Sequence, residues 1–155
     1  MSPNFDQLRK LVLRCGSVLY GHITDITSTE PHYLILLNNN PQDDDAFALV
    51  VASSKVERVS YIRKRYGEDT VVEIAAGVES FLSKPTYINC NDVKPLPIAY
   101  IRSKYNNKEL KCKDATVSKA TLSNILQCVR NSRVVPDDIK NLLPQCEMPQ
   151  DTANK

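Results

Sequence analysis

The sequence predicts a mainly β protein with flanking helices, in which about five short strands form a small, strongly bent antiparallel barrel. Two observations support this prediction. Apolar residues alternate or run continuously over strand-length segments, and the turn-forming stretch "NNNPQDDD" separates two such segments. The strands also follow one another without the regular helical crossovers that a parallel sheet requires. We expect an N-terminal helix, a helix after the third strand and a C-terminal helical segment.

The composition is that of an ordinary globular protein. The chain has 155 residues, of which 42% are hydrophobic and 25% charged, so a single domain over 1–155 is expected. Its net charge of +2 creates no global basic field, and any binding of nucleic acid must depend on local patches. The 5 cysteines are scattered without a CxxC pair, as in reduced cytoplasmic proteins. No signal peptide or membrane-spanning apolar run is recognised, so the protein is expected in the cytoplasm, away from the membrane.

The N-terminal part begins with a helix and continues with three strands. Residues 5–15 place apolar side chains at spacings of three and four, which is typical of one helical stripe, and Gly16 follows as a stop. From residue 17 the period changes to two, the period of a strand. The continuously apolar runs "YLILL" at 33–37 and "AFALVVA" at 46–52 indicate a hairpin of buried strands.

Helical and strand patterns alternate beyond this hairpin. A helix is expected in "SKVERVSYIRKRYG" at 54–67, because apolar residues recur every three positions and Ser54 with Glu57 forms a capping-box pattern, and Gly67 should stand just beyond its end. The β-rich segments "TVVEI" and "TYIN" follow as further strands, and "VKPLP" should end the last one because proline cannot donate to a ladder. Residues 99–115 are basic and polar with little periodicity, so no element is predicted there.

Two helices are predicted in the C-terminal segment at 116–143, outside the barrel core at 16–97. The first begins at a Ser118 cap and has a clean apolar face at i, i+3, i+4 and i+7. The second begins at Pro136, with acidic residues in its first turn. The tail at 144–155 lacks a core-forming pattern and is expected to be flexible.

Four segments resemble the PemK and MazF family of toxins, the ribonuclease halves of bacterial toxin-antitoxin pairs. They are "GSVLYGHI", "PHYLILLNN", "AFALVVASS", which ends in a hydroxyl pair, and "KPTYINCNDVKPL". The resemblance implies an SH3-like barrel, which is also the simplest arrangement for the predicted strands. It further implies an endoribonuclease that cleaves single-stranded RNA without a metal or other cofactor, and that an antitoxin protein neutralises. Whether the protein forms a homodimer is left open.

The chain departs from this family at the residue that usually acts on the scissile phosphate. Family members carry an Arg-Pro pair at the entry of the second strand, where this chain has Pro31 and His32. Cleavage by the neighbouring 2′-hydroxyl needs a base, an acid, and donors or cations on the phosphate. His32 can act as the base near neutral pH, and Ser53 occupies the family's hydroxyl position. Lys55 or Lys84 can supply positive charge, although lysine is a point charge and does not copy a bidentate arginine.

A second group of residues is predicted to bind RNA. The segment "YIRKRY" interleaves rings with cations, which suits unstacked bases and phosphates, and the strand exit "TYINCND" offers hydroxyl and amide groups. The RNA-binding candidates are Tyr61, Arg63, Arg65, Thr86, Asn89 and Asn91, together with Lys55 and Lys84. Each segment also has a plainer interpretation: "YIRKRY" as a solvated helix face, and the strand exit as ordinary turn chemistry.

Plainer interpretations also exist for the other candidates. His32 precedes an apolar strand, as many surface or satisfied histidines do, and Ser54 is explained by its cap, so Ser53 is the preferred hydroxyl. Cys90 lies beside apolar positions, which is typical of buried, inert thiols rather than nucleophiles. His22 and His32 lack the spacing of metal ligands, and no metal is predicted.

Two other classes of function stay open beside the ribonuclease. One is a non-catalytic SH3-like module that has lost the arginine and binds nucleic acid or a protein partner. The other is an adaptor protein whose amphipathic helix at 118–130 docks on a partner.

Overall fold

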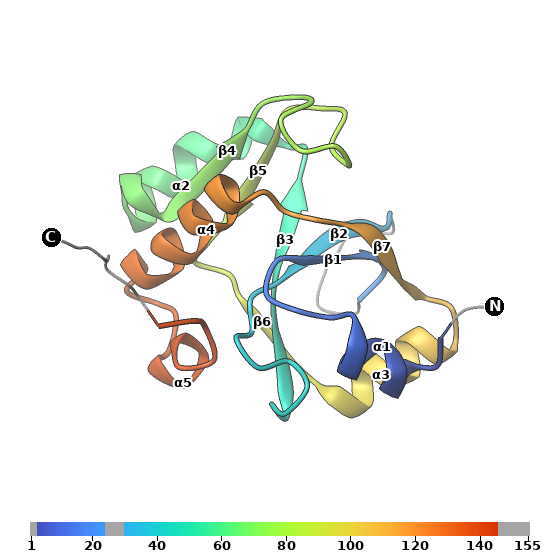
Figure 1. Ribbon diagram of the computed structural model, residues 1–155. Coiled ribbons are helices and arrows are strands. Elements are labelled where there is room, and N and C mark those ends of the chain that lie inside the picture. Colours follow the sequence, from blue (N-terminus) through green and yellow to red (C-terminus); the bar gives the residue numbers. More distant parts are fainter. Residues whose placement is uncertain (1–2, 24–29, 146–155) are drawn as a thin grey trace, which may run out of the picture.

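The computed structural model describes residues 3–23 and 30–145, which form a seven-stranded antiparallel sheet with helices on both sides (Figure 1). The strands are β1 (Ser17–Gly21), β2 (His32–Leu36), β3 (Ala46–Ser53), β4 (Val71–Ile74), β5 (Thr86–Asn89), β6 (Lys94–Pro97) and β7 (Leu110–Thr116). The helices are α1 (Phe5–Leu11), α2 (Val59–Tyr66), α3 (Ile98–Asn106), α4 (Lys119–Asn131) and α5 (Asp137–Lys140). Two 3₁₀ turns, η1 (Val56–Arg58) and η2 (Glu68–Thr70), flank α2.

Strand β3 is the centre of the sheet. One of its edges pairs with β2, and its other edge pairs first with β6 and then, through Ala52 and Ser53, with β5. The order is β4-β5-β3-β2-β1-β7, with β6 off this path. Among the described residues these pairings leave the sheet open, with β4 and β7 at its ends. The protein is therefore mixed α/β rather than mainly β, and seven strands replace the predicted five.

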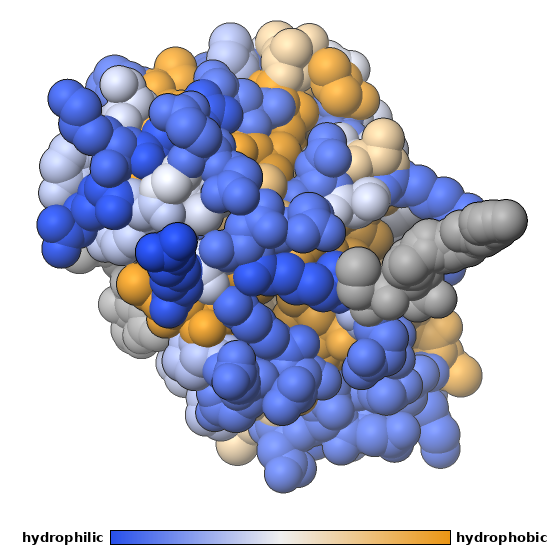
Figure 2. All heavy atoms as spheres, turned by 90° about the vertical axis from the view of Figure 1, so that its left-hand side faces the viewer, coloured by the Kyte–Doolittle hydropathy of each residue, from blue (hydrophilic) through white to orange (hydrophobic). Residues whose placement is uncertain are grey.

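Strands β2 and β3 are buried on both faces, which explains their continuous apolar sequences. On one face, Leu34 and Leu36 belong to a core that also contains Phe5 of α1 and Ile101 of α3. On the other face, Ile35 belongs to a second core with apolar side chains of α4 and α5. The outer surface over α2, α4 and α5 is mainly hydrophilic, with hydrophobic side chains visible in separate patches (Figure 2).

The predicted N-terminal helix and first three strands are present as α1, β1, β2 and β3, although α1 ends at Leu11 and not at the predicted stop, Gly16. The helix predicted in 54–67 begins later, with η1 at Val56, and α2 ends at Tyr66 with Gly67 just beyond it, as expected. Its predicted capping box is wrong. The residue before η1 is Lys55 rather than Ser54, and no side chain caps this turn. The hydroxyl that bonds a backbone N–H here is that of Ser53, which accepts from the Lys55 N–H.

Two predictions for the segment after β5 are also wrong. "VKPLP" does not end the sheet but forms β6, because Pro95 and Pro97 are two residues apart on an outer strand and turn their nitrogens away from β3. Residues 99–115, expected to lack structure, form most of α3 and β7. Strand β7 was not predicted because its sequence has no apolar alternation. It is an edge strand in which only Leu110 is buried.

The C-terminal helices are confirmed as α4 and α5. The Ser118 side chain accepts a hydrogen bond from the Thr121 N–H, which is the predicted cap. The predicted flexible tail lies largely outside the described residues, which end at 145. None of the described helices is both long and apolar enough to cross a membrane.

Candidate active site

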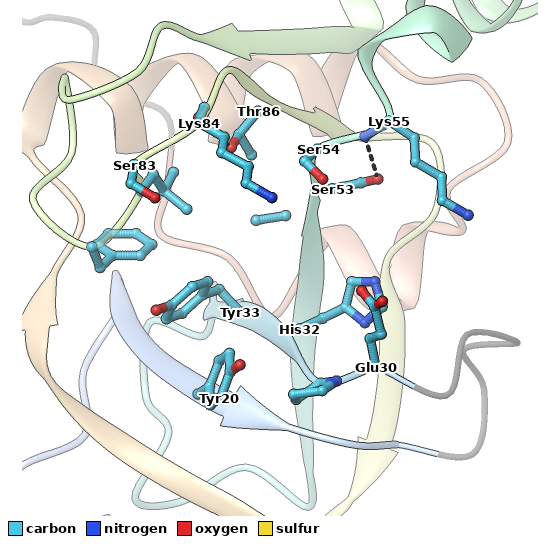
Figure 3. Close-up of a pocket in the computed structure, with 14 residues that line it drawn as sticks. Tyr20, Glu30, His32, Tyr33, Ser53, Ser54, Lys55, Ser83, Lys84 and Thr86 are labelled. Carbon is cyan, nitrogen blue, oxygen red and sulfur yellow. Dashed lines mark hydrogen bonds between the residues drawn. The ribbon is translucent and has the colours of Figure 1, made fainter.

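A cavity of about 260 Å³ at the ends of β2 and β3 brings together half of the predicted site residues (Figure 3). These residues are His32, Ser53, Lys55, Lys84 and Thr86. They come from three separate segments of the chain: the start of β2, the end of β3 with the following turn, and the loop that leads into β5. The cavity therefore collects both predicted catalytic residues and both lysines proposed to replace the family arginine.

His32 and Ser53 are neighbours across two strands. The register of β2 and β3 pairs Tyr33 with Ala52 and Leu34 with Val51. The same register places His32 opposite Ser53, where the two strands end. Opposed side chains in an antiparallel pair lie on one face of the sheet, with their Cβ atoms roughly 4.5–5.5 Å apart.

The imidazole of His32 has an unusual environment. Its Nδ1 atom is buried, and no described residue forms a hydrogen bond with it. Leaving a buried polar atom unpaired costs about 1–3 kcal/mol, so native structures rarely do so without a reason. The residue itself lines the cavity, and an imidazole in such a place is suited to exchange a proton with a bound group.

Ser53 has a defined hydroxyl orientation. Its Oγ accepts a hydrogen bond from the Lys55 N–H at 3.2 Å, drawn as a dashed line in Figure 3. With this contact on the oxygen, the hydroxyl hydrogen can point into the cavity and donate to a ligand. Ser54 also lines the cavity but has no role as a helix cap.

Two lysines give the cavity positive charge. Lys55 follows β3, and Lys84 extends its ammonium group towards the centre of the cavity (Figure 3). In the described part of the chain, neither has a carboxylate within ion-pair distance. Thr86 has a structural role instead. Its buried hydroxyl donates to the Lys84 carbonyl oxygen at 2.9 Å and so fixes the end of the loop that leads into β5.

An aromatic wall that the sequence analysis missed completes the cavity. The ring centroids of Tyr20 and Tyr33 are 4.6 Å apart, and those of Tyr33 and Phe81 are 5.2 Å apart. The ammonium of Lys113 lies 5.8 Å from the centre of the Tyr20 ring, which adds a cation at the edge of this wall. The alternation of β1 and β2 contained a signal for the two tyrosines, which are cross-strand partners. Phe81 lies in a loop and had none.

The loop that contributes Phe81 and Lys84 is anchored to α4 by Glu79. This carboxylate is only 3% exposed and accepts three hydrogen bonds, from the Ser118 N–H at 2.9 Å, the Ser118 hydroxyl at 2.7 Å and the Thr121 hydroxyl at 2.6 Å. Burial by itself raises the pKa of Glu79, but the hydrogen bonds from Thr121 and Ser118 outweigh it, so the pKa lies below its usual value. Glu79 is therefore held as a carboxylate at the N-terminus of α4.

The remaining predicted RNA-binding residues lie elsewhere. Tyr61 and Asn89 line a second cavity, described below. Arg63 is paired with Glu73 at 2.6 Å, and Arg65 lies over the Tyr66 ring at 5.4 Å from its centre. These two arginines do not line either cavity.

Asn91 has a structural role and lines neither cavity. Its side-chain amide donates to the Thr70 hydroxyl and to Asn89 Oδ1, both at 2.9 Å, and its Oδ1 accepts from the Ser132 hydroxyl at 2.7 Å. It therefore ties the end of β5 to the residue that follows α4.

Cys90 has the environment of a structural thiol rather than of a nucleophile. Cys90 is fully buried, and its pKa is raised by a hydrogen bond with the Cys128 thiol and by burial, so it stays a neutral thiol. No cluster of three His, Cys, Asp or Glu side chains that could hold a metal occurs in residues 3–23 and 30–145.

No protein-family model matches the chain, and no curated protein matches its sequence.

Proposed function

We propose that the protein is a metal-independent endoribonuclease that cleaves single-stranded RNA in the cavity at the ends of β2 and β3. The observation that carries this proposal is the convergence of His32, with its unpaired ring nitrogen, and Ser53 on one face of the sheet. Two lysines without ion-pair partners among the described residues line the same cavity. A base, a hydroxyl donor and cations are the groups that attack by a 2′-hydroxyl requires.

The reaction proceeds by internal transfer of the phosphate. The His32 imidazole takes the proton of the 2′-hydroxyl, and the 2′-oxygen attacks the phosphorus. The Ser53 hydroxyl and the Lys55 ammonium stabilise the charge that develops on the phosphate oxygens. The bond to the 5′-oxygen breaks, and this oxygen leaves with a proton from Lys84. The products are a 2′,3′-cyclic phosphate and a 5′-hydroxyl end, and exchange with water restores both side chains.

The aromatic wall accounts for a preference for single strands. The rings of Tyr20, Tyr33 and Phe81 form one continuous contact series in the cavity. Bases of unpaired RNA can stack on such rings, whereas bases of a duplex remain stacked on each other.

We also propose that the protein is a toxin of the PemK and MazF type, in which β1 to β5 of the open sheet correspond to the family's SH3-like barrel, with a partner antitoxin in the cytoplasm. The support is the resemblance of the segments in 16–97 and the central position of β3, which pairs with β2 on one edge and β5 on the other. In this proposal, His32 replaces the catalytic arginine of the family.

The proposal is tested by incubating purified protein with a long single-stranded RNA in EDTA and mapping the fragment ends. Wild type should produce discrete cuts with 5′-hydroxyl ends, and His32→Ala and Ser53→Ala should each reduce the rate by at least about 100-fold. Ser54→Ala, which removes the neighbouring hydroxyl, is the matched control and should retain activity. Uncut RNA with folded wild-type protein would contradict the proposal.

A non-catalytic module that binds RNA is the second candidate, favoured by Pro31 and His32 standing where the family has Arg-Pro. In that case the same RNA stays intact but binds with an affinity that falls steeply as salt increases, because lysine contacts to phosphates release counterions.

A further inference from the structure

A second cavity adjoins the proposed active site. It has a volume of about 510 Å³ and is lined by residues of η1, α2, β3 and β5. Ser53 lines both cavities. They therefore meet at the hydroxyl group that the proposed mechanism uses.

The lining of the second cavity combines an exposed ring with a free cation. Tyr61 is 66% exposed, although most large aromatic side chains of the chain are buried or half-buried. Arg58 has no carboxylate within ion-pair distance in the described residues. Aromatic rings beside cations are the usual platform for the bases and phosphates of single strands.

These side chains form a row that leads from one cavity to the other. Lys55, Arg58 and Tyr61 are spaced three residues apart along η1 and the start of α2, and side chains at this spacing lie on the same side of a helical turn. Lys55 lines the first cavity, whereas Arg58 and Tyr61 line the second. Val59 and Ile62 of the same helical segment pack into a small core with side chains of β4 and β5, and Ile62 also lines the second cavity.

We propose that the second cavity binds the nucleotide next to the scissile one, with its base on the Tyr61 ring and its phosphate between Lys55 and Arg58. The first cavity, at about 260 Å³, is smaller than the roughly 300–1,000 Å³ of typical ligand pockets, so a strand held there must continue across the neighbouring surface. This inference rests on the proposed function, because it concerns the same RNA strand.

The carboxylates of the second cavity indicate which bases suit it. Both acidic groups of the lining are exposed, but Asp92 is paired with Lys94 at 3.1 Å, whereas Glu57 has no ion pair among the described residues. A carboxylate repels phosphate but accepts a hydrogen bond from an exocyclic amino group, such as N4 of cytosine. An oligonucleotide of cytidine is therefore the appropriate probe.

The test is binding of a fluorescent 2′-O-methyl hexacytidylate, which cannot be cleaved through its 2′-oxygen, measured by anisotropy at fixed salt. Tyr61→Ala and Arg58→Ala should each weaken binding by roughly tenfold, whereas Tyr61→Phe, which keeps the ring, should bind like wild type. Lys64→Ala removes an exposed cation of the same helix that lines neither cavity and is the matched control. Thermal unfolding confirms that each variant is folded.

The outcomes separate this inference from the proposed function. If wild type cleaves RNA and Tyr61→Ala and Arg58→Ala bind the hexamer as tightly as wild type, the second cavity is not used and only this inference fails. If wild type neither binds the hexamer nor cleaves RNA, both proposals fail. A tenfold loss that also appears in Lys64→Ala would point to general charge attraction and would likewise overturn the inference.

Discussion

Single residues in this protein are placed by strand register more than by local sequence. His32 and Ser53 are 21 positions apart in the sequence, yet the pairing of β2 with β3 makes them neighbours. Their residue types could be selected from the sequence, because a histidine and a serine at strand ends suit proton transfer. The two lysines beside them were also predicted, but the aromatic wall was not, since its rings come from β1, β2 and the loop before β5.

Asn38 offers a test of a single buried residue. It is fully buried, and its amide donates to Asp44 Oδ2 and to the Ala46 carbonyl, both at 2.9 Å, while its Oδ1 accepts from the Ala48 N–H at 2.7 Å. Asn38→Asp keeps the shape but puts an acceptor against two acceptors, one of them charged. We expect a loss of about 3 kcal/mol in the free energy of unfolding, measured by urea denaturation.

The control for this prediction is Asn39→Asp, the same change at the exposed neighbouring position, which should alter stability by less than about 0.5 kcal/mol. Lowering the pH should reduce the difference between Asn38→Asp and wild type, because protonation of the new carboxyl group removes its charge. Equal stability of the two variants at neutral pH would show that the Asn38 contacts do not hold the β2–β3 connection.

At the scale of elements, the loop between β4 and β5 depends on a helix distant in sequence. Its Glu79 occupies the N-terminus of α4 together with the Ser118 cap, and its Phe81 belongs to the aromatic wall. The sequence predicted α4 and its cap, because these are local patterns. It did not predict the loop's anchor, since a carboxylate in the segment "AAGVESFLSKP" looks like any solvated loop residue.

Glu79→Gln should loosen this anchor. A glutamine has one amide nitrogen, which cannot accept hydrogen bonds, so at least one of the Ser118 and Thr121 donors loses its partner. We expect a loss of about 1–3 kcal/mol in the free energy of unfolding and faster amide exchange in residues 75–85. Glu68→Gln, at an exposed glutamate that accepts no such set of bonds, is the control.

The same anchor predicts a pH dependence. The pKa of Glu79 is lower in the folded protein than its ordinary value, so its stabilising contribution is complete above the ordinary carboxyl pKa of 4.5. The contribution is lost as the pH falls through the lower pKa of the folded state. The difference in urea midpoint between wild type and Glu79→Gln should therefore be constant near pH 7 and shrink progressively as the pH falls below 4.5; a difference that does not change would contradict this assignment.

At the scale of the whole molecule, one sheet supports two cores. Adjacent residues of β2 alternate between them, so Leu34 faces α1 and α3 while Ile35 faces α4 and α5. Burial of β2 and β3 could be predicted from their uninterrupted apolar runs. The helices that cover each face could not, because α3 lies in a basic segment whose few apolar residues, such as Ile98 and Ile101, gave too short a pattern.

This shared sheet predicts cooperative unfolding. Leu34→Ala and Ile35→Ala remove side chains from opposite cores, and each should cost about 2–5 kcal/mol. Because both cores use the same strands, each variant should shift a single transition seen equally by circular dichroism and by tyrosine fluorescence. Leu11→Ala, at a side chain that is 77% exposed, should change little. Two separate transitions would show that the cores unfold independently and would contradict the single-domain prediction.

The hydrogen bond between Glu79 and the Ser118 N–H also has a consequence for the order in which the molecule is made. It joins residues 39 positions apart, and the chain is synthesised from its N-terminus. When the segment that forms β5 has just emerged from the ribosome, the nascent chain already contains His32, Ser53 and Lys84. It does not yet contain α4, the helix that anchors the loop between β4 and β5. We expect the cavity to assemble only after the segment that forms α4 has emerged, so the growing polypeptide acquires a complete site late in translation.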